Sequence, residues 1–255
     1  MYLSAERLAL ANQSVKETFE QCSIVWQAIP NWDTGDPGQI RVADGKYNTP
    51  GFLNLGVEEE EFEVTLAQAN GPTPDSLLTE VMAASKTLAK KVDDDILPKL
   101  YAGAATTYPT KAGAQELQDT LIKARADVED AGCRAPSCLL TNTTGLAKLS
   151  QLVSGASILP VLVTAANFNA LHRSTQLDPP DSGPRMVLIG RRRRIPQGAA
   201  PEASPGEEPV DVAVSLAPSL EIDGETGTGA IKLTVRIRYA LRITDATGLV
   251  AIHNP

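Results

Sequence analysis

Aromatic residues, cysteine and histidine are scarce in this chain of 255 residues. Phe, Trp and Tyr together make up 4% of it, so its core has to consist mainly of Leu, Val, Ile and Ala. The cysteines Cys22, Cys133 and Cys138 are odd in number and form no Cys-x-x-Cys pair, which argues against a disulfide framework and a tetrahedral zinc site. We therefore expect a reducing compartment, no metal and no cofactor.

Motifs of catalysis are also missing. Only His172, in a helix-like stretch, and His253, near the end of the sequence, could serve as a catalytic histidine, and neither lies in a recognisable motif. There is no Gly-x-Ser-x-Gly elbow, and the glycine-rich stretch 224–229 matches neither a dinucleotide-binding nor a P-loop pattern. The acidic runs 58–61 and 93–95 are poor metal cages, because consecutive side chains point in different directions. The sequence thus predicts no catalytic residue and disfavours an enzyme or small-molecule binder on an α+β fold.

Long apolar runs and an excess of basic residues are absent too. No window approaches 18 consecutive apolar residues, and the first ten residues lack the apolar core of a signal peptide. With 23 basic and 31 acidic residues the net charge is −8, which argues against attraction of the whole surface to nucleic acid or to a membrane. One basic run stands out, made of Arg191, Arg192, Arg193 and Arg194. Since no aromatic residue interleaves with it, we rank contact with another copy, or solvation, above nucleic-acid recognition.

Helical periodicity is clear in four segments. Ser4 can cap a helix that runs to Pro30. Thr73 and Pro74 introduce a second, unusually long helix that we expect to end at Pro98. A third helix precedes Gly132, and a fourth is expected over residues 144–153. The long helix suggests a structural spine.

Strand-like segments fill most of the second half. Short apolar runs at 158–164 and 186–189 are expected to be buried strands, and 211–216 another. The clearest pattern is the alternation over 231–244, which predicts one long strand with an apolar face and a basic face. The basic face carries Arg236, Arg238 and Arg242, for which contacts to DNA and contacts to another subunit are both open interpretations.

An extended excursion precedes the long helix. It contains strand-like pieces at 40–42 and 61–68, which we interpret as a long two-stranded loop. Such a hairpin buries little by itself, so we expect it to lie on a neighbouring subunit. Long exposed elements leave strand edges unpaired in a monomer, and self-assembly would cover them.

The order of these elements resembles a known family. The segment Val92-Asp93-Asp94-Asp95-Ile96-Leu97 is similar to the end of its spine helix, and 131–142, 159–163 and 187–190 are similar to the rhythm of its A-domain. Residues 233–250 resemble its returning strand and following turn, with Ala246 in place of a proline. The family is the Hong Kong 97-type capsid fold, found in major capsid proteins of tailed phages and in encapsulin shells.

This resemblance implies an α+β fold of defined parts. They would be an N-terminal arm (1–38), an E-loop (39–70), a P-domain with spine helix (71–132), an A-domain (133–209), returning P-domain strands (210–246) and a C-terminal segment returning to the A-domain (247–255). E-loop contacts to a neighbour would involve Lys46, Glu58, Glu59 and Phe62. Some members of the family form a covalent crosslink from an E-loop lysine to an asparagine of a neighbour. Lys46 lies in the loop, but no specific asparagine partner is evident, so we expect no such crosslink.

The implied function is that of a structural shell protein. We expect a major capsid protein that forms pentamers, and hexamers in larger shells, around double-stranded DNA held by non-specific contacts. Scaffold, portal or cement proteins would be its partners, and the virion capsid, assembled in the bacterial host cytoplasm, its location. No long scaffolding segment precedes the arm, which suggests a separate scaffold, a scaffold-free small shell or an encapsulin. The encapsulin shell around a cargo enzyme is the alternative.

Overall fold

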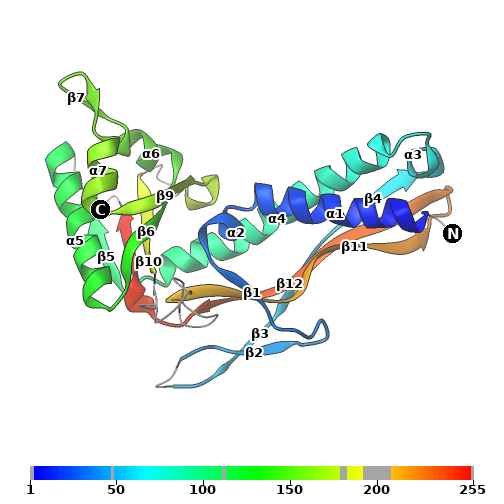
Figure 1. Ribbon diagram of the computed structural model, residues 1–255, viewed down its shortest axis with the longest axis horizontal. Helices are drawn as coiled ribbons and strands as arrows, with labels where there is room; N and C mark the ends of the chain where they lie inside the picture. Colours follow the sequence, from blue (N-terminus) through cyan, green and yellow to red (C-terminus); the bar gives the residue numbers. More distant parts are fainter. Residues whose placement is uncertain (1–2, 47–48, 111–112, 179–182, 192–207, 254–255) are drawn as a thin grey trace, which may run out of the picture.

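The computed structural model describes residues 3–46, 49–110, 113–178, 183–191 and 208–253. It shows an elongated body, built on one long helix and several long strands, joined at one end to a more compact lobe (Figure 1). The chain begins at the far end of the elongated body and ends in the lobe. A small two-stranded hairpin projects below the middle of the body.

A four-stranded sheet forms one layer of the elongated body, in the order β1-β11-β12-β4. The long strands β11 and β12 form an antiparallel hairpin, β4 pairs antiparallel with β12, and β1 pairs parallel with β11. The strand expected over 231–244 is therefore confirmed, and the one expected at 211–216 is the start of a longer strand. The strands are β1 (Asn31–Asp33), β4 (Gly56–Thr65), β11 (Val210–Glu225) and β12 (Ala230–Ile243).

Helices cover one face of this sheet, with α1 (Ala5–Cys22) over β11 and α4 (Asp75–Ala102) over β4 and β12 (Figure 1). The Ser4 side chain accepts a hydrogen bond from the Arg7 amide, so the predicted cap is confirmed. The helix expected to run to Pro30 is interrupted at Ser23, which caps a second short helix, α2 (Ile24–Ala28). One further turn, α3 (Leu66–Asn70), links β4 to the long helix.

The long helix α4 continues past Pro98, contrary to the expected end there. Proline removes one backbone hydrogen bond at a cost of roughly 3 kcal/mol. Leu97 and Leu100 are fully buried on either side of it, so packing outweighs the local preference. At 28 residues the helix is about 42 Å long. Like every other described helix, it has no stretch apolar enough to cross a membrane.

The lobe contains a five-stranded sheet in the order β5-β13-β10-β6-β9. Helices α5 and α7 pack together beside this sheet (Figure 1). The strand expected at 186–189 and the helix ending before Gly132 are both confirmed. The elements are β5 (Thr106–Pro109), α5 (Ala114–Asp130), β6 (Arg134–Thr141), α6 (Thr143–Leu149), α7 (Leu159–Ala166), β9 (Phe168–Arg173), β10 (Arg185–Arg191) and β13 (Leu249–His253), with short 3₁₀ turns at Thr175–Leu177 and Ala246–Gly248.

Three expected elements differ from the structure. The apolar run 158–164 lies in helix α7, because Pro160 sits in its first turn and an apolar run of this length fits either a buried strand or a helix. The helix expected over 144–153 stops at Leu149 and is followed by a small hairpin, β7 (Leu152–Val153) and β8 (Ala156–Ser157). His172, placed by the sequence in a helix-like stretch, lies in strand β9.

The extended excursion also pairs differently from expectation. The short strand β2 (Arg41–Ala43) pairs with β3 (Phe52–Asn54), while β4 joins the main sheet beside β12. The predicted pairing of 40–42 with 61–68 is thus wrong. The partner of β4 lies far along the sequence, where local alternation gives no information about it.

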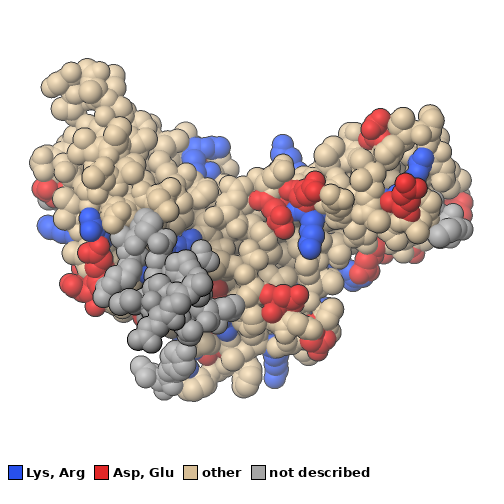
Figure 2. Space-filling view, in the orientation of Figure 1, with Lys and Arg blue, Asp and Glu red and all other residues tan. Residues whose placement is uncertain are grey.

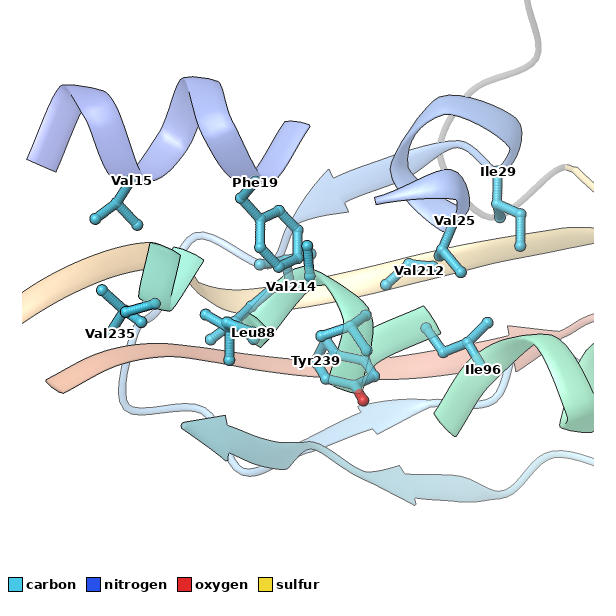
Figure 3. Close-up of a cluster of buried hydrophobic side chains, with 14 of the residues drawn as sticks. Val15, Phe19, Val25, Ile29, Leu88, Ile96, Val212, Val214, Val235 and Tyr239 are labelled. Carbon is cyan, nitrogen blue, oxygen red and sulfur yellow. The ribbon is translucent and has the colours of Figure 1, made fainter. Parts of the chain in front are cut away.

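The core is aliphatic, as the composition predicts. In the elongated body it lies between the helices and the sheet, where Phe19 of α1 reaches toward Val214, and Leu88 of α4 lies nearby (Figure 3). The lobe has a separate cluster that includes Leu117, Leu139 and Leu188. Two cores in one chain match the division into body and lobe.

The three cysteines differ in accessibility, which leads to a test. Cys22 is exposed, whereas Cys133 and Cys138 are buried, and burial raises the pKa of Cys138 to about 11 against a smaller opposing effect of Arg191. Because the thiolate is the reactive form, we expect a thiol reagent at pH 8 to label only Cys22 in the folded protein. Cys22→Ser should abolish this native labelling, and urea should expose the other two. Fast native labelling of the Cys22→Ser variant would contradict the structure.

Candidate assembly surfaces

The outer face of the long sheet, turned away from the helices, carries charges of both signs. In the register of β4 with β12, Glu59 lies opposite Arg236 and Glu63 opposite Lys232. The Lys232 ammonium lies 2.7 Å from a Glu61 carboxylate oxygen, and its hydrogen bond to this carboxylate raises the pKa of Lys232. The basic row on β12 therefore faces an acidic row on β4.

The other neighbour, β11, is acidic on the same face. Arg236 forms an ion pair with Glu221, and the Thr234 hydroxyl donates to Asp223 at 2.6 Å. Arg238 is held by a hydrogen bond from its guanidinium to the Pro37 carbonyl (3.1 Å). Lys232 and Arg236 are thus paired with carboxylates of β4 and β11, whereas Arg238 lies opposite Val57 and Leu216.

Arg242 is buried and serves the subunit's own structure. Its guanidinium makes two 2.7 Å hydrogen bonds to the carboxylate of Asp211, which is itself 1% exposed. A third bond reaches the Ala43 carbonyl at 2.9 Å, and the Trp32 ring lies 4.7 Å from the guanidinium carbon. This corrects the expectation that Arg242 faces DNA or another subunit. Its role is to tie together β1, β2, β11 and β12.

The β2–β3 hairpin rests on the outer face of its own sheet. Val42 and Leu55 pack there against Ala213 and Ala240 in a small third cluster. The Asp44 carboxylate accepts hydrogen bonds from the Lys46 and Gly51 amides, both 3.1 Å, and these bonds lower the pKa of Asp44. The hairpin is therefore docked at its base.

Apolar side chains remain open to solvent on this hairpin. Phe52 is 77% exposed and Ile40 65% exposed, in a chain that has only four phenylalanines. Both lie in the segment that the sequence predicts to contact another subunit.

The four residues predicted to make E-loop contacts have different positions. Lys46 is exposed and lies with Glu58 at a cavity of about 530 Å³ between the hairpin, β12 and the end of α4. Glu59 is exposed, and its carbonyl accepts a hydrogen bond from Lys91 that protects the open edge of β4. Phe62 is partly buried and packs against the main core, and its contact with a neighbour stays a prediction.

Of the predicted basic run, Arg191 lies within the described part of the chain. It ends β10 and donates a hydrogen bond from its guanidinium to the Ala28 carbonyl at the end of α2. Burial, with a smaller contribution from the charge of Arg191, lowers the pKa of His172. Arg192, Arg193 and Arg194 lie outside the described residues.

No group of three or more metal-ligating side chains occurs among the described residues. The acidic run 93–95 illustrates the reason, because its carboxylates diverge. Asp93 is buried toward the arm, Asp94 is exposed, and Asp95 contacts Lys99 at 2.6 Å and the Tyr239 hydroxyl at 3.1 Å. Burial is the main reason that the pKa of Tyr239 is raised, and Asp95 adds to it.

Comparison with known proteins gives no match to a family model and none to a curated sequence. Solved structures do match, over nearly the whole chain. A virus-like particle from Pyrococcus furiosus has a TM-score of 0.68 at 15% identity, covering 97% of this chain and 98% of that one. The encapsulin complex of Synechococcus elongatus has a TM-score of 0.63 at 14% identity, covering 91% and 88%. The capsid of Myoviridae phage XM1 has a TM-score of 0.59 at 11% identity, covering 92% of both.

The chain has the Hong Kong 97-type fold. The resemblance that rested on the order of sequence elements is confirmed. The contacts of Asp93 explain one of the carboxylates in the acidic run near the end of the long helix α4.

Asp93 fastens the arm to the long helix. Its Oδ1 accepts hydrogen bonds from the Ser23 hydroxyl (2.8 Å) and the Val25 amide (3.1 Å), and its Oδ2 accepts one from the Ile24 amide (2.9 Å). These amides are the unpaired donors at the start of α2. A carboxylate on one helix thus caps another, at the point where the arm turns. Sequence reasoning missed this contact, although Ser23 before an apolar stretch was a usable cap signal.

Asp93 should make stability depend on pH. Burial raises its pKa above the ordinary value of 3.8, against the opposing effect of its three hydrogen bonds. A raised pKa means that the folded state binds the proton more readily than the unfolded state does. The contribution of Asp93 to stability is therefore full below pH 3.8 and is lost as pH rises through the folded-state pKa.

Asp93→Asn removes this titration. We expect the variant to be less stable at pH 4, because an NH2 group replaces one of the two accepting oxygens and leaves the donor that faces it unsatisfied, a cost of about 1–3 kcal/mol. The difference from the wild type should shrink as pH rises toward 7. Urea unfolding at several pH values measures it, with Asp94→Asn on the exposed neighbour as the control. A difference that grows with pH would contradict the assignment.

Proposed function

We propose that this protein is a structural shell protein that self-assembles into a closed icosahedral particle. The observation that carries the proposal is the match of 91–97% of the chain to structures described as a virus-like particle, an encapsulin complex and a phage capsid. The docked arm, the hairpin with exposed Phe52 and the extended sheet support it, because they offer surfaces that a lone subunit leaves uncovered. The role is structural and not catalytic.

In this proposal the parts of the chain keep the boundaries expected from the sequence. The arm is 1–38, the E-loop 39–70, the P-domain 71–132 together with 210–246, and the A-domain 133–209 with the closing segment 247–255. Lys46, Glu58, Glu59 and Phe62 remain candidate contacts to a neighbour, joined by Phe52 (77% exposed) and Ile40 (65% exposed). Pentamers, and hexamers in larger shells, are the expected units.

The finer function that we propose is that of a major capsid protein of a tailed phage, assembled in the bacterial cytoplasm around double-stranded DNA with scaffold, portal or cement proteins. The described outer face does not favour strong DNA binding, since Lys232 and Arg236 are paired with carboxylates of the same subunit. Weak non-specific contact is consistent with packaged DNA that has to move. The encapsulin shell is the alternative, supported by the similarity to the Synechococcus elongatus complex.

Expression of the full chain, alone and together with its neighbouring genes, tests the proposal. Negative-stain microscopy should show closed particles of uniform size. A chain that elutes only as monomer or dimer under all these conditions would refute the shell function. Nuclease-protected double-stranded DNA inside the particles supports the capsid, whereas a packaged protein supports the encapsulin.

A further inference from the structure

The turn between α3 and the long helix α4 contains the one Asn-Gly pair of the sequence, Asn70-Gly71. It lies at the far end of the elongated body, where residues 71–74 belong to no helix or strand (Figure 1). Asn70 is the last residue of α3 and is exposed. In Figure 2 this end of the body carries acidic and basic side chains among neutral ones. Water therefore reaches the Asn70 amide, and a further charge there would not be buried.

An Asn-Gly pair can lose its side-chain amide without an enzyme. Hydroxide removes the proton of the glycine N–H, and the nitrogen lone pair attacks the side-chain carbon of the asparagine. The C–N bond to the NH2 group breaks, ammonia leaves with a proton from water, and a five-membered imide remains. Water then opens the imide at either carbonyl to give aspartate or isoaspartate. One water is consumed, one ammonia is released and nothing is oxidised. Glycine favours the attack because it has no Cβ to obstruct it.

Both reacting groups of this pair are free of hydrogen bonds within the part of the chain that the structure describes. The Asn70 side-chain amide has no partner there, and α3 ends without a capping bond from the Gly71 N–H. The reason lies in Pro72, because the residue before a proline is pushed into an extended conformation, and Gly71 has φ −55° and ψ 165°. An N–H without a partner is available to lose its proton.

Asn54 is the contrasting case in the same part of the chain. It is exposed as well, but its Oδ1 accepts a hydrogen bond from the Arg41 guanidinium at 3.1 Å. The N–H that follows it, that of Leu55, donates to the Ile40 carbonyl at 2.9 Å. Neither group is free to react, and Leu55 carries a side chain that obstructs the attack.

The arm restrains the turn through Arg7, which lies in the first turn of α1 and is half-buried. Its guanidinium donates one hydrogen bond to the Ala69 carbonyl and one to the Gly71 carbonyl, on either side of Asn70. Closure of the imide requires the backbone at Asn70 to leave its helical conformation, so that the Gly71 nitrogen faces the side-chain carbon. Two hydrogen bonds from one planar guanidinium oppose that rotation.

We propose that Asn70 is a site of spontaneous deamidation that the docked arm restrains, and that its conversion loosens the arm. Isoaspartate adds a carboxylate, and it adds one methylene to the backbone between the two carbonyls that Arg7 holds. Arg7 cannot keep both hydrogen bonds unchanged in the lengthened turn. Because ammonia is lost, the change is irreversible and accumulates with the age of the chain. The proposal concerns the single subunit and does not rest on the shell function.

Mass spectrometry of aged, folded protein tests the site. Residues 47–86 form one tryptic peptide that contains both Asn54 and Asn70. Deamidation at Asn70 should exceed that at Asn54 at least about tenfold, because only Asn70 precedes glycine and lacks hydrogen bonds. Its rate should rise with hydroxide concentration. Asn70→Gln should abolish it, since a glutamine would have to close a six-membered imide. Conversion of Asn70 no faster than that of Asn54 would overturn the site.

Arg7→Met tests the restraint by the arm. The variant should convert at Asn70 at least about threefold faster than the wild type, because the turn regains conformational freedom. Loss of the nearby positive charge acts in the opposite direction, but between solvated groups that effect is small. Lys16→Met, at an exposed position of the same helix, is the control and should convert at the wild-type rate. An unchanged or slower rate in Arg7→Met would overturn the restraint.

Limited proteolysis tests the loosening of the arm. Aged wild type with isoaspartate at position 70 should be cleaved between Ala5 and Ala28 at least about twofold faster than fresh protein, because the arm opens more often. Asn70→Gln aged for the same time should be cleaved at the rate of the fresh variant. Equal cleavage of fresh and converted wild type would overturn the loosening. All three measurements use the unassembled subunit, so their failure leaves the shell function standing, and a chain that never forms particles leaves this proposal standing.

Discussion

Arg242→Met is expected to lower the free energy of unfolding by about 3–5 kcal/mol, the range found when one partner of a buried ion pair is removed. The variant leaves the Asp211 carboxylate buried without a cationic partner from Arg242, although the neutral indole N–H of Trp32 still donates to it (3.0 Å). It also leaves the Ala43 carbonyl without its partner from Arg242. Urea unfolding of the unassembled subunit measures the loss.

Arg238→Met is the matched control. It makes the same change on the same strand and the same face, but Arg238 is partly exposed and donates a hydrogen bond to a loop carbonyl, that of Pro37. Its expected cost is about 0.5 kcal/mol. The double variant Asp211→Leu, Arg242→Met should recover much of the loss, since no unpaired charge remains. Equal costs for Arg242→Met and Arg238→Met would contradict the structural role assigned to Arg242.

Phe19→Ala is expected to cost about 3–5 kcal/mol, as for other fully buried aromatic residues. Phe19 is fully buried, and its ring meets Trp26 edge to face at 5.0 Å between ring centres. It reaches from α1 toward the sheet, beside α4 (Figure 3). Its removal leaves a cavity beneath the arm and takes away the aromatic contact that joins α1 to α2.

Two measurements check this prediction. Urea unfolding gives the loss of stability, and limited proteolysis should show faster cleavage between Ala5 and Ala28 in the variant, because the arm opens more often. Leu10→Ala is the control, since Leu10 lies on the same helix but is 39% exposed and should cost below about 1 kcal/mol. Unchanged cleavage in Phe19→Ala would show that the arm is held by other contacts.

Local patterns in the sequence were sufficient to predict several helices and strands. The alternation over 231–243 identifies β12 because a period of two is a property of the strand itself. The spacing of Leu77, Val81, Leu88 and Val92 identifies α4, because the helical period of 3.6 residues is likewise a property of the helix itself. Ser4 and Gly132 mark helix ends because their roles depend on adjacent backbone, and Gly132 has the positive φ of +88° that favours glycine after a helix.

Other features depended on which segments lie side by side. The alternating arginines of β12 indicate a face but not its neighbours, and the neighbouring strands β4 and β11 turned out to be acidic there. Arg242 has the same sequence surroundings as Arg236, yet only Arg242 is buried, because Trp32, Asp211 and the β2–β3 hairpin cover it. Because the interpretation of the basic stripe rested on one strand alone, it wrongly placed Arg242 among the residues that contact DNA or another subunit.

The sequence by itself determined an aliphatic, aromatic-poor core, a long amphipathic helix, a long two-faced strand and the order of elements that resembles the Hong Kong 97-type fold. These features follow from side-chain periodicity and backbone preferences within a few residues. Only the tertiary structure decided the pairing of β4 with β12, the helix at Leu159–Ala166, the helix beyond Pro98 and the burial of Asp93 and Arg242. The strand pairing, the helix beyond Pro98 and the burial of Asp93 and Arg242 depend on packing, hydrogen bonds or charges from residues distant in the chain, which outweigh local preferences of a few kcal/mol.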